Sequence, residues 1–463
     1  MPKKRKSKSG KFIIIYKKFV FLFLCFLLLA VNCSGKPKDI NVILISIDTL
    51  RSDHLSGYGY KRNTSPFLDK IAKDGILFKN VISSASWTAP SMVSMFTSLN
   101  SSEHGIIHGT FIDGDVYNQE VLTGSLLTLP MILKKNGFFT MGFSTNPHLS
   151  KKMGFAKGFD IFTYAPFSDS KILDKIILDF KNKYLKKDKK FFLWIHYMDI
   201  HWPYRARQPW IKEYAKKDFD DINFQIIPNT FKDKYKLDKN NKDLLENLID
   251  RYDSEINFLD SNISKLFKEF PVEDNNLVIV TADHGEEFLE HNGFTHGNNL
   301  YNQTIKVPLI IRLPAFMNKK GISIEDNAGI IDIMPTLLSL LNIPAESKLK
   351  GENLLPLIEN GKTSGKRIII SELYKGMKNI VSFTQDRWKY IYDFKTNKVE
   401  LFDLKNDKGE QINLIDKNTA VKSSMEKQLK IHLESMKSKK IQARLVKPDS
   451  KDVESLKSLG YIE

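Results

Sequence analysis

The feature that most constrains this chain is an apolar run at residues 277–282 that leads directly into Asp283 and His284. A short apolar run without polar alternation predicts a strand that is buried on both faces, as in a parallel sheet. Ligands bind beyond the carboxyl ends of the strands in such sheets. Asp283 and His284 are therefore predicted to lie at a functional edge, where a carboxylate beside an imidazole suits a divalent cation.

Three further apolar runs lead into polar residues in the same way. They cover residues 41–47, 140–144 and 191–195, and the polar residues that follow them are Asp48, Asn146, His148, His196 and His201. Helical patterns lie between the runs, at residues 65–74, 91–98, 127–136 and 244–267. Alternation of strands and helices predicts an α/β fold with a mostly parallel, doubly wound sheet.

The pattern of predicted elements changes near residue 367, from alternating strands and helices to consecutive strands. Strand-like runs joined by short polar turns are followed by a helical pattern at residues 419–437; the runs cover residues 368–372, 380–384, 388–393 and 399–404. Short turns between strands favour antiparallel pairing. We therefore expect a catalytic domain over residues 40–365 and a smaller C-terminal α+β subdomain of antiparallel strands over residues 366–463.

Residues 1–32 have the pattern of a targeting segment. They hold eight Lys and Arg and no acid, their apolar core spans residues 19–31, and Cys33 follows in a context similar to a bacterial lipobox. The core is shorter than the roughly 20 residues of a membrane span. We expect a signal peptide and a lipoprotein attached to the membrane through Cys33. The alternatives are an uncleaved membrane anchor and simple secretion, and all three place the body outside the cytoplasm.

Net charge limits the classes of partner that this chain can be expected to bind, and cysteine content excludes thiol-based sites. The net charge is +16, half of it from residues 1–32, and the rest comes mostly from scattered lysines. No nucleic-acid-binding motif accompanies them, so the basic bias indicates at most an anionic substrate or a membrane surface. The only cysteines are Cys25 and Cys33. The folded body therefore has no disulfide, no cysteine nucleophile and no thiolate metal site.

A Trp, a Thr-x-Pro sequence and a helix-forming stretch follow one another at residues 87–98. This order places the Thr88 hydroxyl near a helix N-terminus, where developing negative charge is stabilised. A metal ion beside the hydroxyl would lower its pKa and make it a nucleophile. Thr88 is therefore a candidate for both metal binding and catalysis.

Over residues 40–463 the chain resembles the sulfatase family of the alkaline phosphatase superfamily. The motifs that carry the resemblance follow the family's order: Ile47-Asp48-Thr49-Leu50-Arg51, Thr88-Ala89-Pro90-Ser91, Asn146-Pro147-His148, Asp199-Ile200-His201-Trp202-Pro203-Tyr204, Thr281-Ala282-Asp283-His284-Gly285-Glu286, Val307-Pro308-Leu309, Trp388-Lys389-Tyr390-Ile391, Glu400-Leu401-Phe402-Asp403-Leu404 and Leu459-Gly460-Tyr461. Each motif alone is weak, and their common order makes the set specific.

The resemblance implies a metal site. Asp48, Asp283 and His284 match the family's metal ligands, and Thr88 matches the nucleophile that shares the metal. The family usually has a second acid where Thr49 stands. Fewer carboxylates and an imidazole ligand favour Zn²⁺ or Mn²⁺ as the expected cofactor, one or two divalent ions, with Ca²⁺ and Mg²⁺ as the alternatives.

The resemblance also implies roles for the histidines. His201 and His148 match residues that hold the ester oxygens or protonate the leaving group. His296 falls where the family places a cationic residue, usually lysine, and is a further catalytic candidate. His196, at a strand end, is a candidate for substrate binding.

Two departures from the family pattern bear on the reaction. Sulfatases carry a cysteine or serine that is oxidised to formylglycine, whereas Thr88 cannot form that aldehyde, and they carry arginine where Met92 stands. A threonine nucleophile is similar to that of the phosphoethanolamine and phosphoglycerol transferases of the same superfamily. Those enzymes have several membrane helices before the catalytic domain, however, and the C-terminal motifs here look like those of sulfatases.

The sequence therefore predicts a metal-dependent hydrolase or transferase that acts on a sulfate or phosphate ester through Thr88. The alternatives are a phosphoethanolamine- or phosphoglycerol-type transferase and a phosphodiesterase. A hypothesis from another class is an inactive lipoprotein that holds an anionic ligand in the same pocket. The expected partner is an anionic ester of a glycan, a lipid head group or a small molecule, with no nucleic acid.

Overall fold

The computed structural model describes residues 40–113, 116–185, 189–215, 222–269, 275–346, 348–361, 367–376, 378–438 and 443–458. The predicted targeting segment, Cys33 and the Leu459-Gly460-Tyr461 motif lie outside the described residues. The lipoprotein, anchor and secretion hypotheses therefore stay predictions. Within the described ranges, no helix combines the length and the apolar composition that a membrane span requires.

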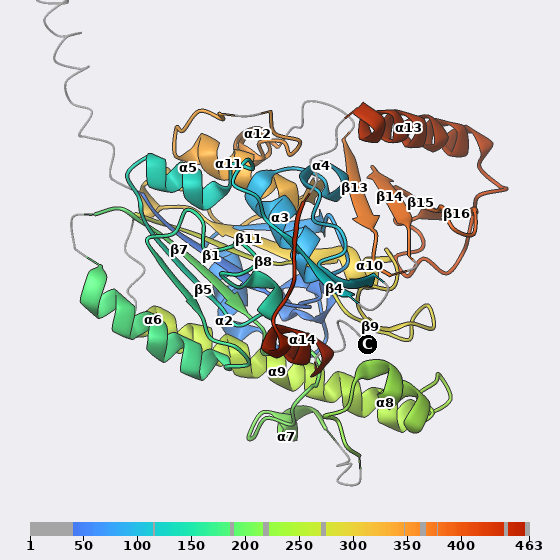
Figure 1. Cartoon of the computed structure of the whole chain (residues 1–463), viewed down its shortest axis with the longest axis horizontal. Coiled ribbons are helices and arrows are strands. Elements are labelled where there is room, and N and C mark those ends of the chain that lie inside the picture. Colours follow the sequence, from blue (N-terminus) through green and yellow to red (C-terminus); the bar gives the residue numbers. More distant parts are fainter. Residues whose placement is uncertain are drawn as a thin grey trace, which may run out of the picture. The chain divides into compact units, whose positions relative to one another are not determined.

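An eight-stranded sheet forms the centre of the fold (Figure 1). Its strand order is β12-β2-β11-β8-β1-β7-β5-β6. Neighbouring strands pair in parallel except at β11, which runs antiparallel to both β2 and β8. The strands are β1 (Asn41–Ile47), β2 (Ile76–Ile82), β5 (Phe139–Ser144), β6 (Ile161–Tyr164), β7 (Phe191–Tyr197), β8 (Asn276–Ala282), β11 (Lys306–Arg312) and β12 (Ile322–Gly329). The predicted mostly parallel α/β fold is confirmed.

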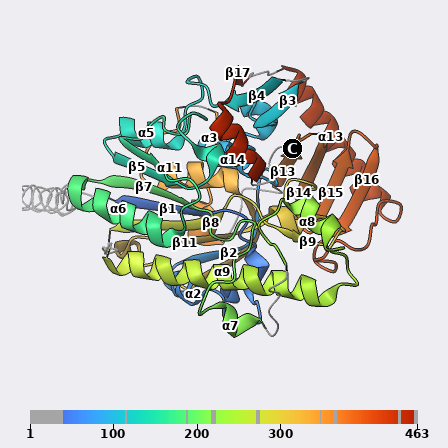
Figure 2. The ribbon, with the colours of Figure 1, turned by 60° about the horizontal axis from the view of Figure 1, so that its bottom comes forward.

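Helices cover both faces of this sheet (Figures 1 and 2). One face carries α2 (Pro66–Lys73), α6 (Ser170–Tyr184) and α9 (Lys242–Glu269), and the other carries α3 (Thr88–Thr97), α5 (Leu129–Lys135) and α11 (Ile333–Leu340). Strands β1, β7 and β8 are consequently buried at every residue, as their uninterrupted apolar runs predict. Shorter elements are α4 (Ser101–His104), α7 (Ile211–Tyr214), α8 (Pro228–Lys234), β9 (Glu287–Phe288), β10 (Phe294–Thr295), α10 (Asn302–Ile305), α12 (Leu355–Asn360) and α14 (Ser450–Ser458).

Three strands on one side of the sheet have no counterpart in the prediction: β2, β11 and β12. Strand β11 contains Pro308, and its register with β2 shifts between Val307 and Leu309. Proline cannot donate to the ladder and is tolerated at such an irregularity. Strand β12 lies at the sheet edge and exposes Glu325 and Asp326, so it lacks an apolar run. The pairing of these strands depends on distant neighbours rather than on their own sequence.

The C-terminal part forms a second sheet, which confirms the predicted antiparallel subdomain. Strands β13 (Ile368–Leu373), β14 (Ile380–Gln385), β15 (Trp388–Asp393) and β16 (Lys398–Asp403) pair antiparallel in chain order. Helix α13 (Thr419–Ser438) packs on them through Met425, next to Phe383 and Leu401. Strand β17 (Arg444–Val446) then pairs with β4 (Val116–Val121), which also pairs with β3 (Thr110–Asp113). The limits of the predicted domains stay predictions.

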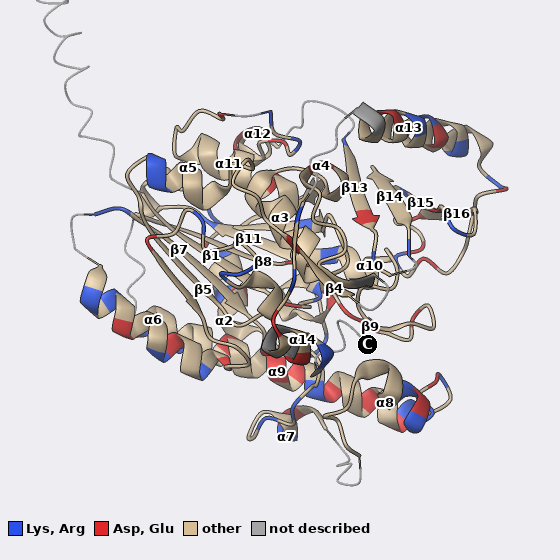
Figure 3. Cartoon of the chain, viewed as in Figure 1, with Lys and Arg blue, Asp and Glu red and all other residues tan. Residues whose placement is uncertain are grey.

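Charged residues of both signs are interspersed along the outer helices. Figure 3 shows Lys and Arg next to Asp and Glu on α6, α8 and α13. A mixed pattern of this kind is typical of solvated helix faces.

Asp174 on α6 should make stability fall as pH rises. The buried carboxyl accepts a hydrogen bond from the Tyr197 hydroxyl at 2.5 Å, and burial raises its pKa to about 8. Between pH 4 and 8 the folded chain keeps a proton there that the unfolded chain releases, so the free energy of unfolding declines across this range. The difference in the free energy of unfolding between Asp174→Asn and the wild type should therefore shift in favour of the variant by at least about 1.4 kcal/mol from pH 5 to pH 8.

Thermal and urea unfolding at both pH values would measure this gain. Asp179→Asn, on the exposed side of the same helix, is the matched control and should show no such pH-dependent difference. Equal unfolding free energies for Asp174→Asn and wild type at both pH values would contradict the prediction.

Candidate active site

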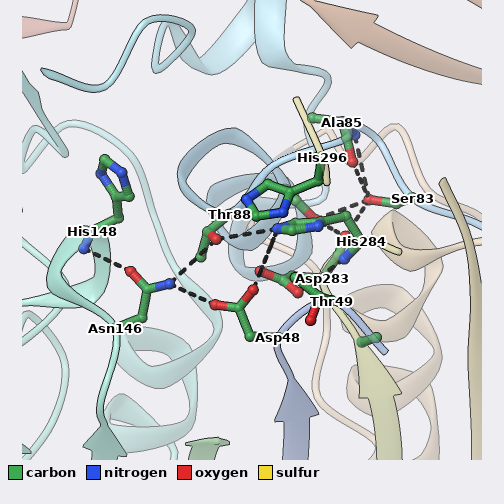
Figure 4. A network of polar contacts seen from close by, with 12 residues as sticks. Asp48, Thr49, Ser83, Ala85, Thr88, Asn146, His148, Asp283, His284 and His296 are labelled. Atoms are coloured by element: carbon green, nitrogen blue, oxygen red, sulfur yellow. Dashed lines mark hydrogen bonds and ion pairs between the residues drawn. The ribbon is translucent and has the colours of Figure 1, made fainter. Parts of the chain in front are cut away.

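The predicted metal ligands meet at the carboxyl edge of the sheet. Strands β1 and β8 are parallel neighbours in which Ile47 pairs with Ala282, so Asp48 and Asp283, one residue beyond each strand, lie side by side. Both are buried, as is His284. Figure 4 shows the three side chains converging with Thr88 and Asn146.

The orientation of His284 directs a lone pair at both carboxylates. Its Nδ1 donates to the Gly285 carbonyl oxygen at 2.9 Å, which leaves Nε2 as the unprotonated nitrogen. Nε2 lies 3.5 Å from Oδ1 of Asp48 and 3.4 Å from Oδ2 of Asp283. Both oxygens are buried, and neither has a hydrogen-bond partner among the described residues. Three acceptor atoms facing one another fit a divalent cation, and the mixed O and N donor set suits Zn²⁺ or Mn²⁺.

The pKa values of the two carboxyl groups are shifted in opposite directions. Burial would raise the pKa of Asp48, but the hydrogen bond from His196 and the nearby imidazoles lower it. Burial and the charge of Asp48 raise the pKa of Asp283 well above its usual value. Two adjacent buried carboxylates repel each other unless a cation or a proton compensates them. This arrangement is further evidence that the residues fit a metal site.

The Thr88 hydroxyl lies in the same cluster. Thr88 is the first residue of α3, directly after the extended N-cap Trp87. Its Oγ1 is 3.2 Å from Nε2 of His284, and it accepts a hydrogen bond at 3.3 Å from the Asn146 amide, which also donates to Oδ2 of Asp48 at 2.6 Å. The predicted nucleophile thus sits at a helix N-terminus and next to all the predicted ligands (Figure 4).

His196 lies beside Asp48, within β7. Its Nε2 is 3.3 Å from Oδ2 of Asp48, and its Nδ1 is 2.8 Å from the Ser46 hydroxyl. Ligand atoms of Asp48, His196 and Asp283 all lie within 4.8 Å of one another. This position favours holding Asp48 or a second cation over contact with a substrate, and the predicted substrate-binding role stays a prediction.

His201 and His296 form a second group next to His284. Their ring centroids are 5.0 Å apart, and the rings of His284 and His296 are 4.4 Å apart. Nδ1 of His201 donates to the Trp202 carbonyl oxygen at 2.6 Å, and Nδ1 of His296 lies 3.0 Å from Oε1 of Glu286. Burial lowers the pKa of His201 to about 4 and that of His296 well below its usual value, and it raises the pKa of Glu286 to about 7.

His148 approaches from the opposite side, after β5. Its ring packs edge-on against Trp87, with the centroids 5.5 Å apart, and its backbone N–H donates to the Asn146 side chain at 2.8 Å. Burial lowers the pKa of His148 to about 3. The structure therefore places the three predicted catalytic histidines close enough for their charges to interact, since His201 and His296 both influence the pKa of His148.

Two serines hold the end of β8 in place. The Ser91 hydroxyl donates to the Asp283 carbonyl oxygen at 2.5 Å, and the Ser83 hydroxyl donates to the same oxygen. Met92, where the resembling family has arginine, is completely buried in α3. The helix face that carries this motif is thus apolar at that position and contributes no charge.

Sequence reasoning did not identify three residues that contribute to the site. Asn146 follows a predicted strand, and Glu286 belongs to the Asp283-His284 motif. Neither pattern predicts which side chains these two residues contact in the folded chain. Half-buried Lys375 has no local signal, because it follows a strand of the C-terminal sheet. Burial lowers the pKa of Lys375 to about 8.

A cavity of about 290 Å³ opens beside His201. Its lining includes Asp199, Trp202, Arg205 and Arg207. An opening next to a catalytic candidate provides space for the group that leaves or for the body of a substrate.

Comparison with known proteins identifies sequence relatives of this chain. Residues 40–343 match the family model described as Sulfatase, and residues 290–439 match that of N-sulphoglucosamine sulphohydrolase, C-terminal. The ulvan-active sulfatase of Formosa agariphila is 23% identical over 364 residues, which cover 71% of this chain and 67% of that protein. Arylsulfatase K of Homo sapiens is 29% identical over 164 residues, 33% of this chain and 30% of that protein. The latter match thus spans under a third of the relative.

Solved structures share the fold across most of the chain. A 2-O GAG sulfatase superposes with a TM-score of 0.69 and 19% identity, covering 88% of this chain and 95% of that one. The phosphonate monoester hydrolase of Agrobacterium radiobacter superposes with a TM-score of 0.66 and 18% identity, covering 86% and 95%. At these identities the likeness concerns the architecture.

Proposed function

Because the chain belongs to the sulfatase family, we propose that it hydrolyses an anionic sulfate ester with Thr88 as the nucleophile. The observation that carries this proposal is the position of the Thr88 hydroxyl, 3.2 Å from His284 and within the cluster formed by Asp48 and Asp283. A cation held by Asp48, Asp283, His284 and Thr88 would lower the pKa of the hydroxyl and offset the negative charge of the ester.

In the first step Thr88 Oγ forms a bond to sulfur as the bond from sulfur to the leaving oxygen breaks. The hydroxyl proton is released to solvent, because a cation held beside Thr88 would lower the pKa of the hydroxyl. The leaving oxygen takes a proton from His296, whose imidazolium is stabilised by Glu286 at 3.0 Å. An anionic ester near His296 also favours that protonated form.

In the second step a water molecule attacks sulfur and the bond to Thr88 Oγ breaks. His296, now neutral, takes a proton from the water, and the Thr88 oxygen takes a proton from solvent. Asn146 keeps the hydroxyl oxygen oriented through its 3.3 Å hydrogen bond. The cycle ends with inorganic sulfate, the free alcohol and the starting protonation states.

A phosphate ester is the second candidate substrate, and transfer to an acceptor alcohol is the corresponding second reaction. The observation that favours phosphorus is Thr88 itself, because a secondary hydroxyl serves direct in-line displacement and cannot become the aldehyde of formylglycine-type sulfatases. The described residues hold no cysteine or thiol that could replace it.

A panel of nitrophenyl sulfate, nitrophenyl phosphate and bis(nitrophenyl) phosphate tests the proposal. The purified protein, supplied with Zn²⁺ or Mn²⁺, should hydrolyse at least one of them, and an added alcohol should capture part of the group if transfer occurs. Absence of turnover on all three, together with tight binding of an anionic glycan or lipid, would instead support the inactive binding protein.

A further inference from the structure

Lys375 brings a positive charge from the C-terminal subdomain to the catalytic loops. It lies two residues beyond β13, in the turn that leads to β14. Strand β13 is attached to the loop that precedes α3, since the Glu372 N–H donates to the Ser84 carbonyl oxygen at 2.8 Å and the Ser371 hydroxyl donates to the Ser83 carbonyl oxygen at 2.6 Å. These bonds couple the position of Lys375 to the loop that carries the nucleophile.

The amine of Lys375 lies close to the sequence neighbours of two catalytic candidates. Its Nζ is 5.3 Å from the centroid of the Trp87 ring, and Trp87 directly precedes Thr88. Gly297, directly after His296 and with φ +74°, lies next to the same amine; a Cβ atom there would lie 3.2 Å from Nζ. Glycine thus provides both the left-handed turn and the space that the lysine occupies.

The electrostatics agree with this position. After burial, the charge of Lys375 is the main cause that lowers the pKa of His148, and it also lowers that of His296. The ammonium group therefore lies within electrostatic reach of both sides of the site. Met92, completely buried, supplies no charge from α3.

We propose that the Lys375 ammonium group binds an anionic oxygen of the transferred tetrahedral group, a sulfate or a phosphate. This inference rests on the proposed function, because it names a residue for the same ester. The site contains two carboxylates that a divalent cation would neutralise, and a bound oxyanion then requires a further positive charge. Lys375 supplies it from outside the helix that holds Thr88, and the turn after β13 becomes part of the active site.

Competition by inorganic phosphate and sulfate tests this role in the metal-loaded protein. Lys375→Met should weaken the binding of both anions by at least about tenfold, since a charge-assisted hydrogen bond is lost. Lys375→Arg should retain affinity within about threefold. Lys378→Met, in the same turn and exposed, is the matched control and should bind as the wild type does.

Titration calorimetry measures this binding without turnover, so it separates the inference from the proposed hydrolysis. Thermal unfolding of each variant identifies a loss caused by misfolding. Wild-type affinity in Lys375→Met, or failure of the metal-loaded wild type to bind either anion, would overturn the inference. Anion binding with no hydrolysis of any ester would leave it standing while the proposed reaction fails.

Discussion

Replacing Thr88 with valine should reduce kcat by about 10³-fold or more, because the substitution keeps the shape of the side chain and removes the attacking oxygen. Thr88→Ser should keep activity within about tenfold, since it retains a hydroxyl at the same atom. Steady-state kinetics on the best substrate of the panel measures both effects. Acid quenching during turnover, followed by high-resolution mass spectrometry, should find a sulfuryl or phosphoryl group on the peptide that contains Thr88.

Thr97→Val is the matched control for this prediction. It makes the same substitution at the other end of α3, where the hydroxyl only donates to the Val93 carbonyl oxygen at 2.7 Å. Its rate should equal that of the wild type. A Thr88→Val variant with wild-type turnover would exclude threonine as the nucleophile, and a modified peptide elsewhere in the chain would name its replacement.

Replacing Asp283 with asparagine should have opposite effects on stability with and without the cation. In the metal-free protein the wild type must keep a proton on Asp283 or bury two mutually repelling carboxylates, since burial and the charge of Asp48 raise the pKa of Asp283. Asparagine removes this cost, so the melting temperature should rise. With Zn²⁺ or Mn²⁺ present, the wild type should gain about 2.7 kcal/mol at 100 times the Kd, whereas the variant should bind at least about 100-fold more weakly and lose its activity.

Thermal unfolding with and without added cation, together with elemental analysis, measures this crossover. Asp260→Asn provides the control, because Asp260 is equally buried but caps α2 through the backbone N–H groups of Phe67 and Leu68. That variant should show the same increase in melting temperature on addition of the cation as the wild type, because Asp260 lies outside the proposed ligand set. An Asp283→Asn variant that binds as much metal as the wild type would refute the proposed ligand set.

Much of the candidate site was predictable, because polar residues that follow apolar strands of a parallel sheet gather at the same edge of that sheet. Parallel strands deliver their carboxyl ends to one edge, so Asp48 and Asp283 had to lie near each other once β1 and β8 paired. Thr88 followed from the pattern of a helix start. The strands with proline or exposed acids, β11 and β12, were not predictable, because partners far away along the chain stabilise them.

The sequence by itself determined the α/β architecture and the chemical identity of the central cluster, since periodicity and residue type are local properties. Only the tertiary structure decided which groups complete that cluster. Asn146 bridges Asp48 and Thr88, and Glu286 lies next to His296. Lys375 reaches the site from another sheet. These contacts depend on how separate elements pack, and no local sequence pattern encodes that packing. They determine the electrostatic environment that surrounds an ester bound beside Asp283 and His284.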